Sequence, residues 1–278
     1  MTIASITLPG GESIPQLGQG TWRMGEVGSR RREEIRALQL GIELGMTLID
    51  TAEMYADGEA ESVTGEAIAG RRDAVFLVSK VLPSHASLQQ TISACEQSLK
   101  RLGTEVIDLY LLHWRGGYGL DDTLSGFEAL QRAGKIRHWG VSNFDVDDME
   151  ELFELGGTGV ATNQVLYNLT RRGVEHDLMP WQAERGIPVM AYSPIEQGRL
   201  AGHRALGEVA RRHGKTEAQI ALAFVLNRSG VIAIPKATSE SHVRDNRAAA
   251  DIVLTPEDFA ALDASFPPPT NRVPLEMI

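Results

Sequence analysis

Val75-Phe76-Leu77-Val78-Ser79-Lys80 is the stretch of the 278-residue chain that most clearly indicates the fold. Its apolar residues do not alternate with polar ones, which is typical of a strand buried on both faces of a parallel sheet. Seven more short runs, most of them of the same kind, lie at residues 17–20, 47–50, 106–113, 136–141, 161–164, 187–192 and 231–235. The sequence therefore predicts eight short, buried strands.

Amphipathic segments separate these strands. In residues 31–45, Ile35, Leu38 and Ile42 recur at helical spacing, and Gly45 then forms a C-terminal cap. Similar patterns predict helices over residues 88–102, 121–133, 145–155, 171–185, 216–226 and 240–250. Thr255 followed by Pro256 predicts the start of a further helix, because threonine caps helix N-termini and proline is favoured at the first helical position.

Eight strands alternating with helices favour a closed α/β fold, the (β/α)8 TIM barrel, which typically has about 250 residues. The alternative is an open doubly wound sheet, which usually carries G-x-G-x-x-G after its first strand. Here the corresponding stretch, Gly18-Gln19-Gly20-Thr21-Trp22-Arg23, lacks the third glycine. Pro9-Gly10-Gly11 predicts the turn of an N-terminal β-hairpin. With no linker or repeat visible, we expect a single domain over residues 1–278.

Composition excludes several classes of function. A formal net charge of -10 argues against nucleic acid as the main partner, because phosphate backbones require a basic surface. The N-terminus does not resemble a signal peptide, and no apolar stretch is long enough to span a bilayer. We therefore expect a cytoplasmic protein that does not contact membranes. The single cysteine, Cys95, cannot form an intrachain disulfide, and the seven histidines lack metal-ligand spacing, so we expect no metal.

Polar residues stand where a barrel carries its chemistry, at the carboxyl ends of strands. Asp50, Lys80 and His113 end three successive predicted strands, and Tyr55 lies just after Asp50. Carbonyl reduction requires a hydride at carbon and a proton at oxygen. A tyrosine hydroxyl can donate that proton, an adjacent ammonium lowers the tyrosine pKa, a carboxylate keeps the ammonium charged, and a histidine can orient the carbonyl. Each residue alone has an ordinary structural explanation, but together they form a set suited to this reaction.

Five segments, in order along the chain, resemble the aldo-keto reductase family, and the bacterial methylglyoxal reductase type most closely. They are residues 45–55 (GMTLIDTAEMY), 109–113 (LYLLH), 134–144 (GKIRHWGVSNF), 191–194 (AYSP) and 234–236 (IPK). The resemblance covers essentially the whole chain. It implies reduction of small aldehydes and ketones with NADPH, with NADH also possible, by a protein that is a monomer.

The resemblance also implies roles for individual residues. Tyr55 would be the general acid, Asp50 and Lys80 its charge partners, and His113 the residue that orients the carbonyl. Contacts to the cofactor would come, from its nicotinamide end to its adenosine end, from Ser142, Asn143, Gln164, Tyr192, Ser193, Lys236, Thr238 and Asn246. Trp22 and Trp114 would line the substrate pocket.

Some of these residues have structural alternatives. Asn143 could cap the helix that begins near residue 145, Gln164 could form hydrogen bonds at the end of the barrel, and Tyr192 could fill the core. Trp114 could equally serve in packing.

The sequence also departs from the family pattern. Many relatives have an arginine six residues beyond the lysine of the Ile-Pro-Lys segment, where it binds the 2′-phosphate of NADPH. Here that position is His242, with Arg244 two residues farther on. NADPH preference would then depend on Lys236, the hydroxyls that follow it and Arg244. The short C-terminal tail suggests an open pocket for small or varied carbonyls.

Two other functions remain as alternatives. A cofactor-binding scaffold with little catalysis would keep the fold, but the complete set of Asp50, Tyr55, Lys80 and His113 argues against lost chemistry. A barrel hydrolase would need paired acids or a metal, and carboxylates at the strand ends are few.

Overall fold

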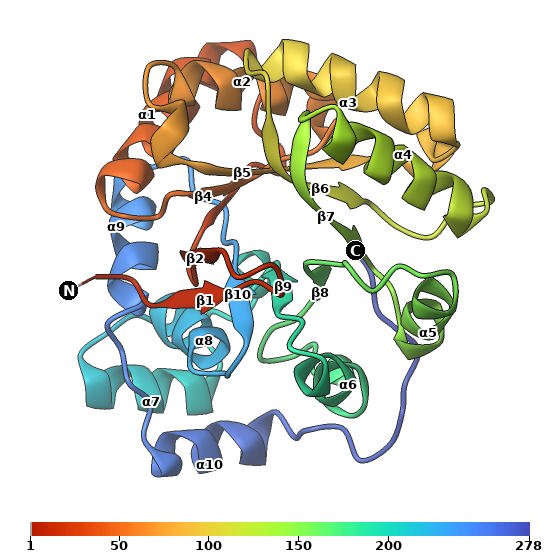
Figure 1. Ribbon diagram of the computed structural model, residues 1–278. Coiled ribbons are helices and arrows are strands. Elements are labelled where there is room, and N and C mark those ends of the chain that lie inside the picture. The colour runs from red at the N-terminus through yellow and green to blue at the C-terminus, as the bar shows by residue number, and fades with distance from the viewer. Residues whose placement is uncertain (1) are drawn as a thin grey trace.

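The computed structural model describes residues 2–278 and contains eight parallel strands surrounded by helices (Figure 1). The strands are β3 (Gln19–Gly20), β4 (Leu48–Asp50), β5 (Phe76–Val81), β6 (Ile107–Leu112), β7 (Ile136–Ser142), β8 (Asn163–Leu166), β9 (Val189–Tyr192) and β10 (Val231–Ala233). They are hydrogen-bonded in chain order, from β3 to β10. Each of them falls within or overlaps one of the eight predicted runs.

The first and last strands meet and close the sheet. Parallel bridges pair Leu17 with Ala233 and Gly20 with Lys236, and the Gly18 amide donates to the Ala233 carbonyl at 2.9 Å. The predicted (β/α)8 TIM barrel is therefore confirmed. We call the carboxyl ends of the strands, together with the loops that follow them, the rim.

Side chains that point inward fill the barrel. Leu48, Val78 and Leu111 belong to one fully buried cluster inside it. Because side chains alternate between the two faces of a strand, residues two positions farther along also point inward. Those residues are Asp50, Lys80 and His113. The strand period thus directs three predicted site residues toward a common point at the rim.

The predicted N-terminal hairpin is also confirmed, as β1 (Ser5–Thr7) paired antiparallel with β2 (Ser13–Pro15). Leu8 and Ile14 join the cluster inside the barrel, and the Glu12 carboxylate lies 2.7 Å from Nε2 of His138 near the start of β7. The hairpin therefore covers the end of the barrel opposite the rim.

The helices that surround the barrel in residues 2–278 follow most of the predictions. They are α1 (Arg31–Glu43), α2 (Glu59–Ile68), α3 (Leu88–Leu102), α4 (Leu120–Arg132), α5 (Val146–Glu154), α6 (Leu178–Glu184), α7 (Arg204–His213), α8 (Glu217–Leu226), α9 (Glu240–Ala249) and α10 (Pro256–Ser265). In the described part of the chain no helix is long and apolar enough to cross a membrane.

Two helices, α2 and α7, lie outside the predicted set. The helix predicted over residues 171–185 is wrong in its first half. A single 3-10 turn (Gly173–Glu175) stands there, and α6 begins anew where the Asp177 carboxylate accepts from the Leu178 amide at 2.8 Å. A capping carboxylate satisfies an amide that would otherwise lack a partner at a helix start, so it favours a break here.

Candidate active site

Lys80 lies at the centre of a buried polar cluster on the rim. Its ammonium donates to Asp50 Oδ2 at 2.8 Å, to the Thr51 carbonyl at 2.8 Å and to the Tyr55 hydroxyl at 3.2 Å. Neither Lys80 nor Asp50 is more than 3% exposed, which matters because a buried charge is tolerated only when it is paired. The three-way contact satisfies all the donors of an ammonium and fixes the tyrosine hydroxyl beside a positive charge.

Asp50 has a second partner that the sequence does not reveal. Gln164 Nε2 donates to Asp50 Oδ1 at 2.7 Å and also contacts the Met190 sulfur at 3.0 Å. The carboxylate is therefore held on both oxygens, one by β5 and one by β8. Burial raises the pKa of Asp50 and lowers that of Lys80, while their mutual attraction opposes both shifts.

The pKa of Tyr55 differs from the expectation. The sequence analysis expects the adjacent ammonium to lower it, but burial, followed by the negative charge of Asp50, raises it well above its usual value. Desolvation outweighs the ammonium because the phenolate would lie almost out of contact with water. Tyr55 therefore keeps its proton at any physiological pH, which is the form that a proton donor needs.

His113 lies against Tyr55 and is buried. The two ring centres are 5.7 Å apart in an edge-on arrangement. Nδ1 of His113 is buried and has no hydrogen-bond partner among residues 2–278. Burial, with a smaller contribution from the Lys80 charge, lowers the pKa of His113 to about 2. The imidazole is therefore neutral and can donate one hydrogen bond to a carbonyl oxygen.

A neutral, buried His113 predicts a specific loss of stability in acid. The unfolded chain takes up a proton on this ring below its ordinary pKa of 6.5, whereas the folded chain does so only near 2. Between pH 7 and pH 5 the free energy of unfolding should therefore fall by about 2 kcal/mol more in the wild type than in His113→Gln. Urea denaturation at both pH values measures this difference. Equal slopes in the two proteins would show that folding does not change the pKa of His113.

Ser142, Asn143 and Tyr192 form a second group beside His113. The Tyr192 hydroxyl donates to Asn143 Oδ1 at 3.0 Å, and Asn143 Nδ2 donates to the His113 carbonyl and to Ser142 Oγ, both at 3.1 Å. Ser142 Oγ in turn donates to the Gln164 carbonyl at 2.8 Å. The structure thus brings the four residues predicted at the nicotinamide end together. Asn143 does not cap α5, because the Asp145 side chain does so.

The rim contains strained backbone. In the described residues seven non-glycine positions have positive φ, and all lie in loops that follow β3, β4, β7 or β9. They are Arg23, Ala56, Asp57, Asn143, Ser193, Glu196 and Gln197. Such backbone costs on the order of 1–3 kcal/mol per residue and concentrates at functional sites. Two of the seven, Asn143 and Ser193, are predicted cofactor contacts.

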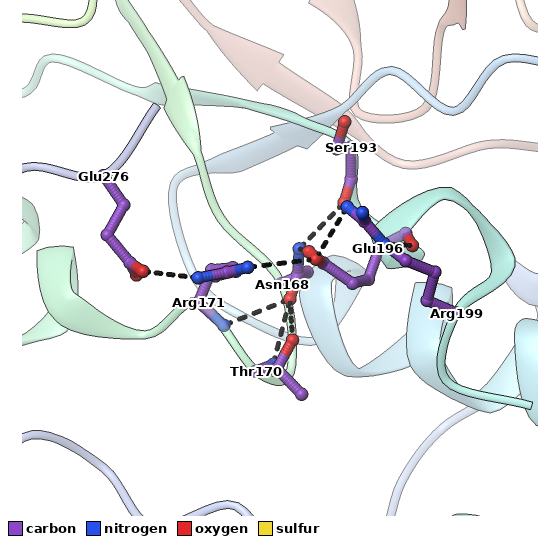
Figure 2. A network of polar contacts seen from close by, with 7 residues as sticks. All are labelled: Asn168, Thr170, Arg171, Ser193, Glu196, Arg199 and Glu276. Atoms are coloured by element: carbon purple, nitrogen blue, oxygen red, sulfur yellow. Dashed lines mark hydrogen bonds and ion pairs between the residues drawn. The ribbon is translucent and has the colours of Figure 1, made fainter. Parts of the chain in front are cut away.

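The loop after β9 is held by a polar network that sequence reasoning missed (Figure 2). Asn168 Nδ2 donates to the Ser193 carbonyl at 3.0 Å and to Glu196 Oε2 at 2.7 Å. The buried Glu196 carboxylate also pairs with Arg171 at 3.4 Å and Arg199 at 3.0 Å. The network fixes the backbone around Ser193. Asn168 is 25 or more residues away from Ser193 and Glu196 in the sequence, so no local pattern indicates the network.

The C-terminal tail joins the same network. Arg171 pairs with Glu276, as Figure 2 shows, and the backbone of Ile278 lies near the Tyr192 hydroxyl. Farther back, Arg272 pairs with Asp147 at 3.0 Å and with Asp177 at 3.2 Å. The tail thus runs along the rim, and Figure 1 shows its end close to β7 and β8.

The residues predicted at the adenosine end lie on the loop after β10 and on α9. The exposed Lys236 ammonium makes no hydrogen bond or ion pair within residues 2–278, and the same holds for the half-buried Asn246 side chain. Thr238 Oγ1 accepts from Arg30 Nη2 at 3.0 Å. Unlike Asp50, Lys80 and Tyr55, these side chains are not bound to one another.

Trp22 and Trp114, the residues predicted to line a substrate pocket, contact Tyr55 and His113, respectively. The Trp22 ring lies 5.0 Å from that of Tyr55, and the Trp114 ring lies 4.9 Å from that of His113. Trp22 is 40% exposed, which is unusual for so large an apolar ring. No group of three or more potential metal ligands is found in residues 2–278.

Comparison with known proteins agrees with this geometry. Residues 16–266 match the profile of the aldo/keto reductase family. The chain is 51% identical to the methylglyoxal reductase YeaE of Escherichia coli over 98% of both chains, and 34% identical to a glyoxal reductase of Bacillus subtilis over 94% of this chain and 92% of the relative. A crystal structure of an aldo/keto reductase from Klebsiella pneumoniae in complex with NADP and acetate covers 100% of both chains, with 49% identity and a TM-score of 0.97. The protein belongs to the aldo/keto reductase family.

Proposed function

We propose that this enzyme reduces small aldehydes and ketones to alcohols with NADPH, and that 2-oxoaldehydes such as methylglyoxal are among its substrates. The observation that carries the proposal is the buried contact of the Tyr55 hydroxyl with the Lys80 ammonium at 3.2 Å, beside a histidine kept neutral by burial. Family membership supports the reaction class. The relatives from Escherichia coli and Bacillus subtilis are a methylglyoxal reductase and a glyoxal reductase.

The chemistry assigns one task to each residue of the cluster. Reduced nicotinamide, when bound, supplies the hydride for the carbonyl carbon. His113 donates a hydrogen bond that orients the carbonyl oxygen, and Tyr55 transfers its hydroxyl proton to that oxygen. The phenolate that remains on Tyr55 is stabilised by the Lys80 ammonium, and Asp50 keeps Lys80 charged and in place. Proton and hydride together convert the carbonyl to an alcohol.

Residues of the rim fit NADPH. At the nicotinamide end Asn143, Ser142 and Gln164 present amide and hydroxyl groups next to the half-buried Tyr192 ring. Ser193 lies between the two ends. At the adenosine end the ammonium of Lys236 has no protein partner in the described residues and suits a phosphate. The cation without a protein partner is thus at the end of the rim where the phosphate of the adenosine ribose would need it.

We expect small substrates to react best. The sequence suggests an open pocket, but Trp22 and Trp114 border the cluster and the C-terminal tail runs along the rim, which disfavours a bulky ketone. NADPH oxidation followed by absorbance should show kcat/KM for methylglyoxal at least about tenfold above that for a steroid ketone, since each poorly fitted contact costs on the order of 1–3 kcal/mol. A higher value for the steroid would contradict this account of the pocket.

The same assay separates catalysis from cofactor binding alone. NADPH binding followed by the fluorescence of Trp22 and its neighbours, without turnover of any small aldehyde, would favour a cofactor-binding scaffold. Binding of neither NADPH nor NADH would refute the proposed function. We further propose that residues 1–278 act as one domain, as a monomer in the cytoplasm, and light scattering after size exclusion tests the monomer.

A further inference from the structure

At the adenosine end of the rim there is no guanidinium at the position six residues beyond Lys236, where the family resemblance implies one. His242 stands six residues beyond Lys236, and its side chain is exposed at the start of α9. An imidazole does not replace arginine, because only the planar guanidinium can bind a phosphate through two parallel hydrogen bonds. If NADPH is preferred, another part of the chain must supply this group.

Arg30, from the N-terminal part of the sequence, places a guanidinium beside the loop that carries Lys236. It ends the 3-10 turn Gly28–Arg30 that leads into α1, and its Nη2 donates to Thr238 Oγ1 at 3.0 Å. The two residues are 208 positions apart and meet because the closed barrel places the loop after β3 next to the loop after β10, where Gly20 is bridged to Lys236.

The charges around Arg30 favour an anion. Partial burial, then the positive charge of Arg30 and more weakly that of Arg23, lower the pKa of Lys236, so these cations are close enough to repel one another. The carboxylate that pairs with Arg30 is Glu33, at 3.5 Å, and both side chains are about half exposed. Glu34 and Glu26 are also near Lys236, but the Glu34 carboxylate is buried and accepts from the Gly25 amide at 3.0 Å. Arg30 and Lys236 thus lie near each other, and the carboxylates that offset them, Glu33 and Glu26, are exposed to solvent.

We propose that Arg30 binds the 2′-phosphate of NADPH together with Lys236 and Thr238, and that it determines the preference of this enzyme for NADPH over NADH. The inference rests on the proposed function, since it assumes that NADPH occupies the rim. The contact between Arg30 and Thr238 holds the guanidinium over the loop that carries Lys236. A phosphate dianion placed there would receive hydrogen bonds from both cations and from the threonine hydroxyl.

Equilibrium binding tests this role without relying on catalysis. Isothermal titration would compare 2′,5′-ADP with 5′-AMP, which lacks the 2′-phosphate, and NADPH with NADH. In Arg30→Gln the Kd values for 2′,5′-ADP and NADPH should rise about tenfold or more, the effect of losing a hydrogen bond between charged groups. The Kd values for 5′-AMP and NADH should stay within about twofold, because such ligands never contact Arg30.

Arg32→Gln is the matched control. Arg32 lies two residues after Arg30, is exposed, and makes no hydrogen bond or ion pair in the described part of the chain. Its substitution by glutamine removes the same charge as Arg30→Gln. An equal loss of NADPH affinity in Arg32→Gln would show that the loss in Arg30→Gln comes only from the change in net charge, and would overturn the proposal. So would unchanged NADPH binding in Arg30→Gln. His242→Arg in the Arg30→Gln protein should restore affinity for 2′,5′-ADP.

The outcome also separates this inference from the proposed function. If the wild type binds neither dinucleotide, the proposed function itself fails. If the wild type binds NADPH and reduces aldehydes but Arg30→Gln leaves its selectivity intact, the function stands and only the role of Arg30 is refuted. A comparable loss for NADPH and NADH in Arg30→Gln would likewise refute it, since that result would indicate damage to the rim.

Discussion

Replacing Tyr55 by phenylalanine should lower kcat for aldehyde reduction by roughly a thousandfold, the usual contribution of a positioned proton donor. The substitution removes only the hydroxyl that accepts from Lys80 at 3.2 Å and leaves the ring that packs against Trp22 and His113. Steady-state oxidation of NADPH at saturating methylglyoxal measures the loss.

The Kd for NADPH provides the control for Tyr55→Phe. This Kd should stay within about twofold of the wild type, because the hydroxyl that is lost acts in the transition state and not in binding of the cofactor. Its measurement uses the quenching of tryptophan fluorescence. Activity within tenfold of the wild type would mean that another group donates the proton, and His113 would then be the next candidate to test.

Replacing Lys80 by methionine should affect both activity and folding. The substitution removes the ammonium that would stabilise the Tyr55 phenolate, and it leaves the buried Asp50 carboxylate without its charge partner. Loss of one partner from a buried ion pair typically costs about 3–5 kcal/mol, so the free energy of unfolding should fall by about that amount. Urea denaturation at pH 7 measures the stability, and NADPH oxidation measures the activity.

The double variant Lys80→Met/Asp50→Asn separates these two effects. A neutral amide at position 50 removes the unpaired charge and can still accept from Gln164 Nε2, which now donates to Asp50 at 2.7 Å. Stability should then recover in part while activity remains absent. Unchanged stability in Lys80→Met alone would contradict a charged pair in the folded protein.

The positions of the site residues at the strand ends could be predicted from the sequence. Asp50, Lys80 and His113 each follow a local apolar run, and the period of a strand alone directs them inward. The hydrogen bond of Gln164 to Asp50 spans 114 positions and that of Arg30 to Thr238 spans 208. Such contacts exist only because the barrel closes, so no local pattern predicts them.

The strands and most of the helices were predicted from local runs of apolar residues, which need no long-range information, but two helices were missed. In α2 the buried residues include the small Ala60 and Ala67, so its apolar face is weakly patterned. In α7, by contrast, Leu206, Val209 and Ala210 are buried on one clearly amphipathic face, so this helix carries a pattern that the sequence analysis did not use. Gly65 and Gly207 lie inside these helices, and an interior glycine weakens a helix signal. Packing against neighbouring helices supplies the stability that the local sequence lacks, as tertiary contacts commonly do.

The positive φ angles at the rim have a consequence for engineering and for evolution. Glycine at Gln197 or Arg23 would relieve backbone strain at exposed positions and make the protein more heat-resistant. The same exchange at Asn143 or Ser193 would loosen backbone that holds predicted cofactor contacts. On the rim, selection for thermal tolerance and selection for turnover therefore act in opposite directions. At the end of the barrel that the hairpin covers they act independently, so a library of stabilising variants is best placed there.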